Sequence, residues 1–212
     1  DMAKKYADEV AQTGFGVPKA VGTVEDGAGP FNWASNADIA NQVGMLIQAK
    51  MYATNQADRD LLSSAALRAM SYLLGNNPLG KSYVTGYGTN PVRNPHHRFW
   101  AKHKDISMPP APPGMLVGGP NGKYQAALVG ANFLDSKWQF AVIDSVTQQV
   151  KHDRGAEKYT DYVIPACLGR DLANWDGEYK SISCYQDDAD SYMTNEVAIN
   201  WNSALFWAVA FQ

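Results

Sequence analysis

Apolar side chains recur at helical spacing along residues 58–74 of this chain. These positions are Leu61, Leu62, Ala65, Ala66, Leu67, Met70, Leu73 and Leu74. The pattern predicts a helix that begins at Asp58 and stops at Gly75, with a proline shortly beyond it. A second apolar-periodic segment runs from Asn36, a suitable N-cap, to about residue 54. Because only a short turn separates the two helices, they are expected to pack antiparallel.

Both ends of the chain also have helical patterns. Residues 1–13 have helical composition and lead into a predicted loop over residues 14–30, which carries several glycines and prolines. Residues 195–211 are predicted to form one long buried helix, because their apolar side chains fall at mixed helical spacings. These side chains are Val197, Trp201, Leu205, Trp207, Ala208 and Phe211. The whole pattern predicts an all-α fold with long loops.

The middle of the chain has no clear periodicity. Residues 75–122 are dense in Gly, Pro, Asn and aromatic residues and are too long for a simple connection, so functional residues are expected there. Within residues 123–180, the segment 126–133 is apolar, 140–150 fits a helix, and 162–168 fits a short buried strand or a turn of helix. No strand alternation or internal repeat stands out.

Composition restricts the class of partner. The chain has 212 residues, of which 45% are hydrophobic and 18% charged, so it can bury a substantial core as one domain or part of one. The formal net charge of -3 does not indicate binding to nucleic acid or anionic lipid, which attract basic surfaces. No apolar stretch is long enough to span a membrane. The first residues lack the apolar region of a signal peptide, so any export signal is expected upstream. The 6 Trp and 11 Tyr offer flat faces that stack on sugar rings, although most aromatic side chains of proteins are core.

The cysteines and acidic residues do not indicate a metal site. Cys167 and Cys184 are too few and too far apart for zinc-ligand spacing, so they form either a disulfide or two buried thiols. Asp187, Asp188 and Asp190 alone lack the spacing of a calcium-binding EF-hand loop. No metal is therefore assigned to this chain.

The first segment that can carry chemistry is residues 82–98, which read SYVTGYGTNPVRNPHHR. Its glycines permit tight backbone turns, and His96 and Arg98, two positions apart in an extended loop, can point the same way. Such a pair can bind hydroxyls or carboxylates. In isolation, however, a His-x-Arg pair more often bonds neighbouring carbonyls and carboxylates.

The second segment is residues 185–203, which read YQDDADSYMTNEVAINWNS. Three aspartates in a loop precede Glu196, near the start of an apolar helix. Glycoside hydrolysis needs a carboxylic acid beside an aromatic, sugar-binding surface, and Glu196 is the natural candidate. The alternative is that these acidic residues only cap the helix and favour its dipole.

Together the two segments resemble the two signatures of glycoside hydrolase family 9, the cellulase family built as an (α/α)6 barrel. The first signature is matched with His96 in an active-site position, and the second with Asp187 and Glu196 in active-site positions. Residues 33–36, 72–78 and 113–121 also match the family, in the same order. The resemblance implies that residues 1–212 are the C-terminal portion of a single catalytic domain.

By this resemblance, Glu196 is the general acid that protonates the departing glycosidic oxygen. His96 and Arg98 hold the sugar next to the cleavage point, and Asp187 supports the site. Trp33 and Trp201 are expected to contact sugar, and Tyr192 and Tyr185 are expected to shape the pocket beneath it. For each of these aromatic residues, packing in the barrel core is the alternative.

Two features depart from the family pattern. The family inverts configuration with a carboxylate base from an N-terminal Asp-Ala-Gly-Asp type motif, and no such motif occurs in these 212 residues. The base is therefore expected from an N-terminal portion or a second chain that completes the barrel. Residues 123–180 lie where a shorter connection is expected, and an insertion there can extend or block sugar subsites.

The leading hypothesis is inverting, endoglucanase-like hydrolysis of β-1,4-glucosidic bonds in cellulose or related β-glucans. The alternatives are a non-catalytic glucan-binding remnant, an exo-acting cellobiohydrolase or β-glucosidase variant, and a different α/α-barrel enzyme acting on another sugar. No cofactor is required; structural calcium occurs in relatives, with ligands largely outside this chain. The resemblance implies secretion, because polymeric cellulose cannot enter a cell.

Overall fold

The computed structural model describes residues 2–18, 31–102, 105–121, 142–143, 150–151, 181–187, 189 and 191–210. Its helices are α1 (Met2–Ala11), α2 (Ser35–Tyr52), α3 (Gln56–Leu73), the 3-10 helix η5 (Ser181–Ser183), α5 (Tyr192–Asn195) and α6 (Ile199–Ala210). Two strands of two residues each, β1 (Val142–Ile143) and β2 (Val150–Lys151), pair antiparallel.

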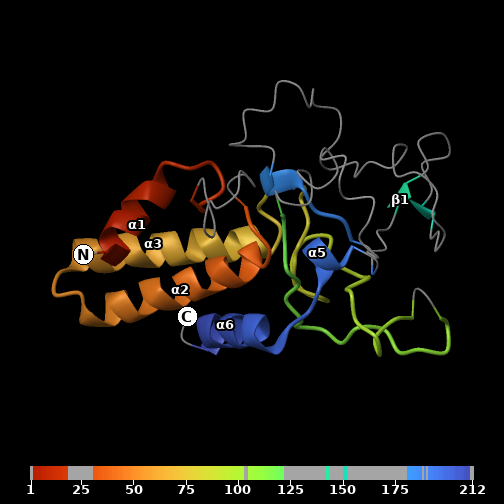
Figure 1. Cartoon of the computed structure of the whole chain (residues 1–212). Coiled ribbons are helices and arrows are strands. Elements are labelled where there is room, and N and C mark those ends of the chain that lie inside the picture. The colour runs from red at the N-terminus through yellow and green to blue at the C-terminus, as the bar shows by residue number, and fades with distance from the viewer. Residues whose placement is uncertain are drawn as a thin grey trace, which may run out of the picture.

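The predicted antiparallel pair of helices forms the centre of the fold. Helices α2 and α3 lie side by side, α6 runs along α2, and α1 packs mainly on α3 (Figure 1). The loops and α5 gather at the end of this pair where α2 begins and α3 ends (Figure 1). Helix α3 stops as predicted, because Gly75 adopts a φ of 122°, a left-handed conformation that favours glycine.

Both helix starts differ from the prediction. Ala34, rather than Asn36, is the N-cap of α2, and it has the left-handed φ of 68°. The Asn36 side chain instead donates a hydrogen bond of 2.9 Å to the Val117 carbonyl. Asn55, rather than Asp58, is the N-cap of α3, because its side-chain oxygen accepts the Asp58 backbone N–H at 2.8 Å. The two errors have different causes: the Asn36 side chain binds a distant segment instead of capping, whereas α3 begins earlier than predicted because of the local cap by Asn55.

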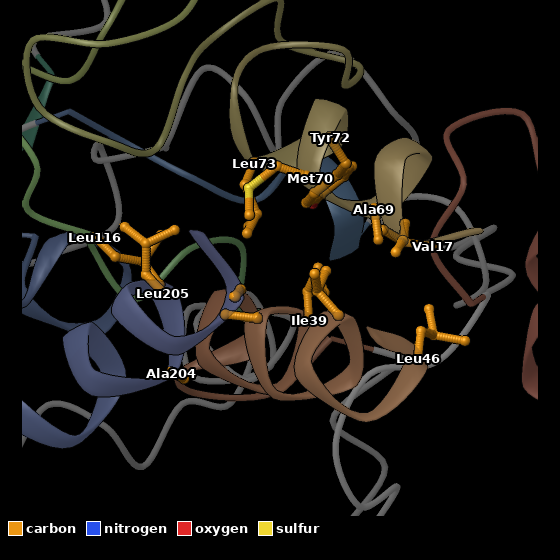
Figure 2. Packing of buried hydrophobic residues seen from close by; sticks show 14 of the residues in the cluster. Val17, Ile39, Leu46, Ala69, Met70, Tyr72, Leu73, Leu116, Ala204 and Leu205 are labelled. Atoms are coloured by element: carbon orange, nitrogen blue, oxygen red, sulfur yellow. The ribbon is translucent and has the colours of Figure 1, made fainter. Parts of the chain in front are cut away.

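Helices α1, α2, α3 and α6 build the hydrophobic core together with several loop segments. Figure 2 shows side chains of α2, α3 and α6 converging, with Leu116 from the loop region beside them. The fully buried members include Ile39, Leu46, Leu73 and Leu116. Burying one such side chain stabilises the fold by about 1.5–3 kcal/mol, so the burial of Leu116 helps to hold its loop against the helices.

The C-terminal segment is two helices, not the single buried helix that was predicted. Helix α5 ends at Asn195, Glu196 is extended with ψ 148°, and α6 begins at Ile199. The break exists because the extended backbone pairs with other segments: the Gly118 N–H donates to the Glu196 carbonyl at 2.9 Å. Only one face of α6 is buried, since Ile199, Phe206 and Val209 are 92%, 75% and 60% exposed.

The middle of the chain corrects one further prediction. Residues 140–150 fit a helix by sequence, yet 142–143 and 150 lie in strands β1 and β2. The β-branched side chains of Val142, Ile143 and Val150 favour a strand. Segments 126–133 and 162–168, and most of the expected insertion at 123–180, lie outside the described residues. Among the helices of the described ranges, none is long and apolar enough to cross a membrane.

Candidate functional site

The two signature segments meet through their backbones. The backbone at His96 pairs in parallel with that at Glu196, and the His96 N–H donates to the Asn195 carbonyl at 2.8 Å. On the imidazole, Nδ1 is hydrogen-bonded to the Ala189 carbonyl. A carbonyl can only accept, so Nδ1 carries a proton and Nε2 of the neutral ring remains an acceptor. The backbones of His96 and Glu196, which were predicted to share one site, lie side by side.

A row of aromatic rings extends from His96. The His96 ring lies 5.8 Å from the Tyr192 ring, and Tyr192 lies 5.7 Å from Trp33. Trp33 precedes α2, Tyr192 belongs to α5, and His96 lies in the long loop, so three distant segments build the row. Trp33 is 39% exposed, and the other two rings are half-buried. The row can therefore present flat apolar surface to a ligand.

Glu196 combines a fixed backbone with an unengaged side chain. Its N–H donates to the Tyr192 carbonyl at 3.2 Å, and its carbonyl accepts from Gly118. The residue is half-buried. Within the described part of the chain, its carboxyl group has no side-chain hydrogen bond and no ion pair. This group is therefore available for proton transfer to a bound molecule.

Asp187, by contrast, is fully engaged in holding the loop together. Its carboxylate accepts the backbone N–H groups of Arg93 at 3.0 Å and Asn94 at 2.9 Å. It also forms an ion pair of 3.0 Å with Lys81, and the side chain is only 16% exposed. These contacts tie the turn that precedes His96 to the loop that precedes α5. The geometry suits a positioning role.

Asn195 is a supporting residue that sequence reasoning missed. It is fully buried, and its side-chain oxygen accepts the Tyr185 hydroxyl at 2.5 Å. Its amide group donates to the Asn94 carbonyl at 2.5 Å. Tyr185 is 3% exposed, its ring meets Tyr83 edge-on at 4.9 Å, and burial together with the charge of Asp187 raises its pKa. Tyr185 thus lies beneath the site rather than at its surface.

The Gly118–Gly119 pair lets three segments approach closely. A Cβ atom on Gly119, whose φ is 93°, would lie 2.3 Å from the Asn36 side chain. A Cβ on Gly118 would lie 3.3 Å from the Trp201 ring. Trp201 is half-buried against this turn, so it packs beside the site. Both glycines lie in the matched segment 113–121, but the sequence did not show how closely α2 and α6 approach them.

Arg98 stays apart from these contacts. It is exposed, and the described residues provide its side chain with no hydrogen-bond or ion-pair partner. No group of three His, Cys, Asp or Glu residues that could hold a metal occurs within the described ranges. Cys184 is buried and disulfide-bonded, and Cys167 lies outside those ranges.

Comparison with known proteins gives a consistent picture. The family model for glycosyl hydrolase family 9 matches residues 2–209. A cellulose 1,4-beta-cellobiosidase of Acetivibrio thermocellus is 30% identical over 99% of this chain, which spans 18% of that protein. A xyloglucan-specific endo-beta-1,4-glucanase of Bacteroides ovatus is 32% identical over 95% of this chain, which spans 25% of it.

A solved structure agrees with the fold. A metagenome-derived glycoside hydrolase family 9 endoglucanase superposes with a TM-score of 0.57 at 30% identity, covering 99% of this chain and 27% of that one. The prediction of an all-α fold that is part of an (α/α)6 barrel is confirmed by this likeness. The chain spans about a quarter or less of these relatives.

Proposed function

Because the chain belongs to glycosyl hydrolase family 9, we propose that it forms part of a catalytic domain that hydrolyses β-1,4-glucosidic bonds, with Glu196 as general acid. The observation that carries this proposal is the position of Glu196. The residue is half-buried, its side chain has no hydrogen bond or ion pair with the described residues, and its backbone pairs with His96 at the end of the aromatic row formed with Tyr192 and Trp33.

Glu196 and the rings of the row have distinct tasks in this mechanism. Glu196 donates its proton to the glycosidic oxygen as the bond to the anomeric carbon breaks. The Nε2 atom of His96 accepts a sugar hydroxyl, and the rings of Trp33 and Tyr192 cover the apolar face of a glucosyl unit.

The base is proposed to come from polypeptide outside these 212 residues. An inverting mechanism needs a second carboxylate about 6.5–9.5 Å from the acid to activate water. Asp187 is unsuited to this task, because two backbone N–H groups and Lys81 already occupy its carboxylate. An N-terminal portion of the same protein, or a second chain, would supply the base together with the remaining barrel helices.

The uncovered face of α6 supports this partner. Ile199, Phe206 and Val209 project large apolar side chains that the described chain leaves 92%, 75% and 60% exposed. Exposed apolar surface of this kind commonly marks an interface. Since the chain spans about a quarter or less of its relatives, the remaining helices of the family fold are the proposed occupant.

We also propose that residues 123–180 form an insertion in the catalytic domain and that the protein is secreted.

The test is Glu196→Gln in the complete protein, with turnover and oligosaccharide binding both measured. Turnover is expected to fall by about 10²- to 10⁴-fold, since glutamine cannot donate the proton, while binding persists. Glu9→Gln, at an exposed position of α1, is the matched control and should leave both unchanged. Turnover at the wild-type rate in Glu196→Gln would refute the assignment.

One alternative has specific support. The cellobiosidase relative at 30% identity favours an exo-acting variant as the second candidate. An endo-acting enzyme lowers the viscosity of a soluble glucan quickly for each reducing end released, whereas an exo-acting enzyme does so slowly. A complete protein that binds glucan but releases no reducing sugar would instead identify a non-catalytic remnant, in which Trp33→Ala should still weaken binding.

A further inference from the structure

Three aromatic rings lie close together on residues 97–100, directly after His96. The His97 ring stacks on Trp100, with centroids 4.2 Å apart and an interplanar angle of 24°. The Phe99 ring meets Trp100 edge-on, at 6.3 Å and 67°. Phe99 is 59% exposed, whereas the other two rings are half-buried. We refer to residues 97–100 as the aromatic turn.

The aromatic turn is held in shape by its own backbone. Nδ1 of His97 accepts the backbone N–H groups of Phe99 at 3.0 Å and Trp100 at 3.2 Å. An accepting ring nitrogen carries no proton, so these bonds fix the neutral tautomer with its proton on Nε2. Burial and the neighbouring His96 lower the pKa of His97, which also favours the neutral ring. A ligand would therefore meet a preformed surface, and binding would order few side chains.

The location of the turn indicates what it binds. His97 is the chain neighbour of His96, from which the row of rings continues to Tyr192 and Trp33. An exposed aromatic ring gains free energy when an apolar surface covers it, and the C–H face of a glucosyl ring is flat enough to do so. Arg98 lies within the turn and is exposed, so its guanidinium can donate to the hydroxyls at the edge of such a ring.

We propose that the aromatic turn is a further sugar-binding subsite, in which one glucosyl unit of a β-glucan packs on Phe99. The stacked pair of His97 and Trp100 fixes the position of Phe99. This inference rests on the proposed function, because it takes the sugar bound at His96 as part of the same glucan chain. Phe99 then determines how tightly longer oligosaccharides bind, and it takes no part in bond cleavage.

The test compares cellotriose and cellohexaose binding to the complete protein and to Phe99→Leu, by isothermal titration calorimetry. Leucine keeps the apolar volume but removes the flat ring. Affinity for cellohexaose is expected to fall about three- to ten-fold, with cellotriose unchanged. Phe99→Tyr keeps a ring and should retain the wild-type affinity. Ile106→Ala, at an 86% exposed apolar residue outside the turn, is the matched control and should change neither affinity.

The outcomes separate the subsite from the proposed function. If the wild-type protein hydrolyses glucan and Phe99→Leu binds cellohexaose as tightly as the wild type does, the subsite is wrong and the function stands. An equal loss for both sugars also overturns the subsite. A lower melting temperature with unchanged affinities would show that Phe99 packs against protein instead. A wild-type protein that binds neither sugar overturns the proposed function and the subsite together.

Discussion

Asp187→Ala is expected to release the loop that carries His96. The Asp187 carboxylate accepts the backbone N–H groups of Arg93 and Asn94, at 3.0 and 2.9 Å, and pairs with Lys81 at 3.0 Å. The side chains of Asp187 and Lys81 are only 16% and 15% exposed. Alanine removes these three contacts and a longer one of 3.5 Å from the Asn195 amide, and it leaves a mostly buried ammonium group without its carboxylate.

The free-energy cost of Asp187→Ala depends on which of the groups that lose a partner are accessible to water. Arg93 is exposed, so water replaces its lost acceptor at little cost. Asn94 is half-buried, and an N–H that loses its acceptor costs about 1–3 kcal/mol. Breaking a fully buried ion pair costs about 3–5 kcal/mol, and this value is lowered here because Lys81 also reaches the Asn90 carbonyl at 3.5 Å. With about 2 kcal/mol for the Asn94 N–H and about 1 kcal/mol left for the Lys81 ion pair, the sum is about 3 kcal/mol, or about 10²-fold in the equilibrium for opening the loop.

Hydrogen–deuterium exchange of the complete protein, read by mass spectrometry over residues 90–98, measures this opening. Exchange in Asp187→Ala should be about 10²-fold faster than in the wild type. Asp187→Asn retains one acceptor oxygen and should be intermediate. The control is Asp105→Ala, because among the described residues the Asp105 carboxylate accepts just the local Ser107 N–H and hydroxyl, at 2.9 and 2.7 Å. Acceleration below about threefold in Asp187→Ala would refute the reasoning.

Two further predictions concern the turns around the site. Gly119→Ala should lose about 1–3 kcal/mol more unfolding free energy than Gly114→Ala. Both glycines have a φ of 93°, but of the two only Gly119 faces a close neighbour, the Asn36 side chain. Equal losses of the two variants in chemical denaturation would contradict this prediction. His97 should titrate below its ordinary value of 6.5, as burial and His96 lower its pKa. Since the unfolded chain then binds the proton first, His97 reduces stability as the pH falls through the window below 6.5 and leaves it unaffected above. An NMR midpoint of 6.5 or higher, or the same pH dependence of stability in His97→Phe, would count against the geometry at Trp100.

The central helices could be predicted because the residues that determine them are close together in the sequence. The apolar spacing over residues 58–74 and the glycine at 75 determine α3 without reference to the rest of the chain. The end of α5 was not predictable, because residues 195–199 contain neither proline nor glycine. The helix ends there because the Glu196 backbone pairs with Gly118 and His96, which are distant in the sequence.

In the candidate site, too, some features could be predicted from the sequence and others depend on contacts between distant segments. The signature motifs predicted that His96 and Glu196 would share one site, and their backbones do pair. The motifs did not show that the Asp187 carboxylate accepts backbone N–H groups, or that Asn195 links Tyr185 to the loop that carries His96. Both roles depend on the distance between loops, and no spacing along the sequence encodes that distance.

The most direct test of the central claim, that Glu196 is the general acid, compares two substrates in Glu196→Gln. A β-glucoside with a dinitrophenyl leaving group departs without protonation, whereas a cello-oligosaccharide needs a proton on the departing oxygen. The variant is predicted to lose about 10²- to 10⁴-fold in kcat/KM on the oligosaccharide and to retain most of its activity on the activated glucoside. An equal loss on both substrates would contradict the assignment of Glu196 as the acid.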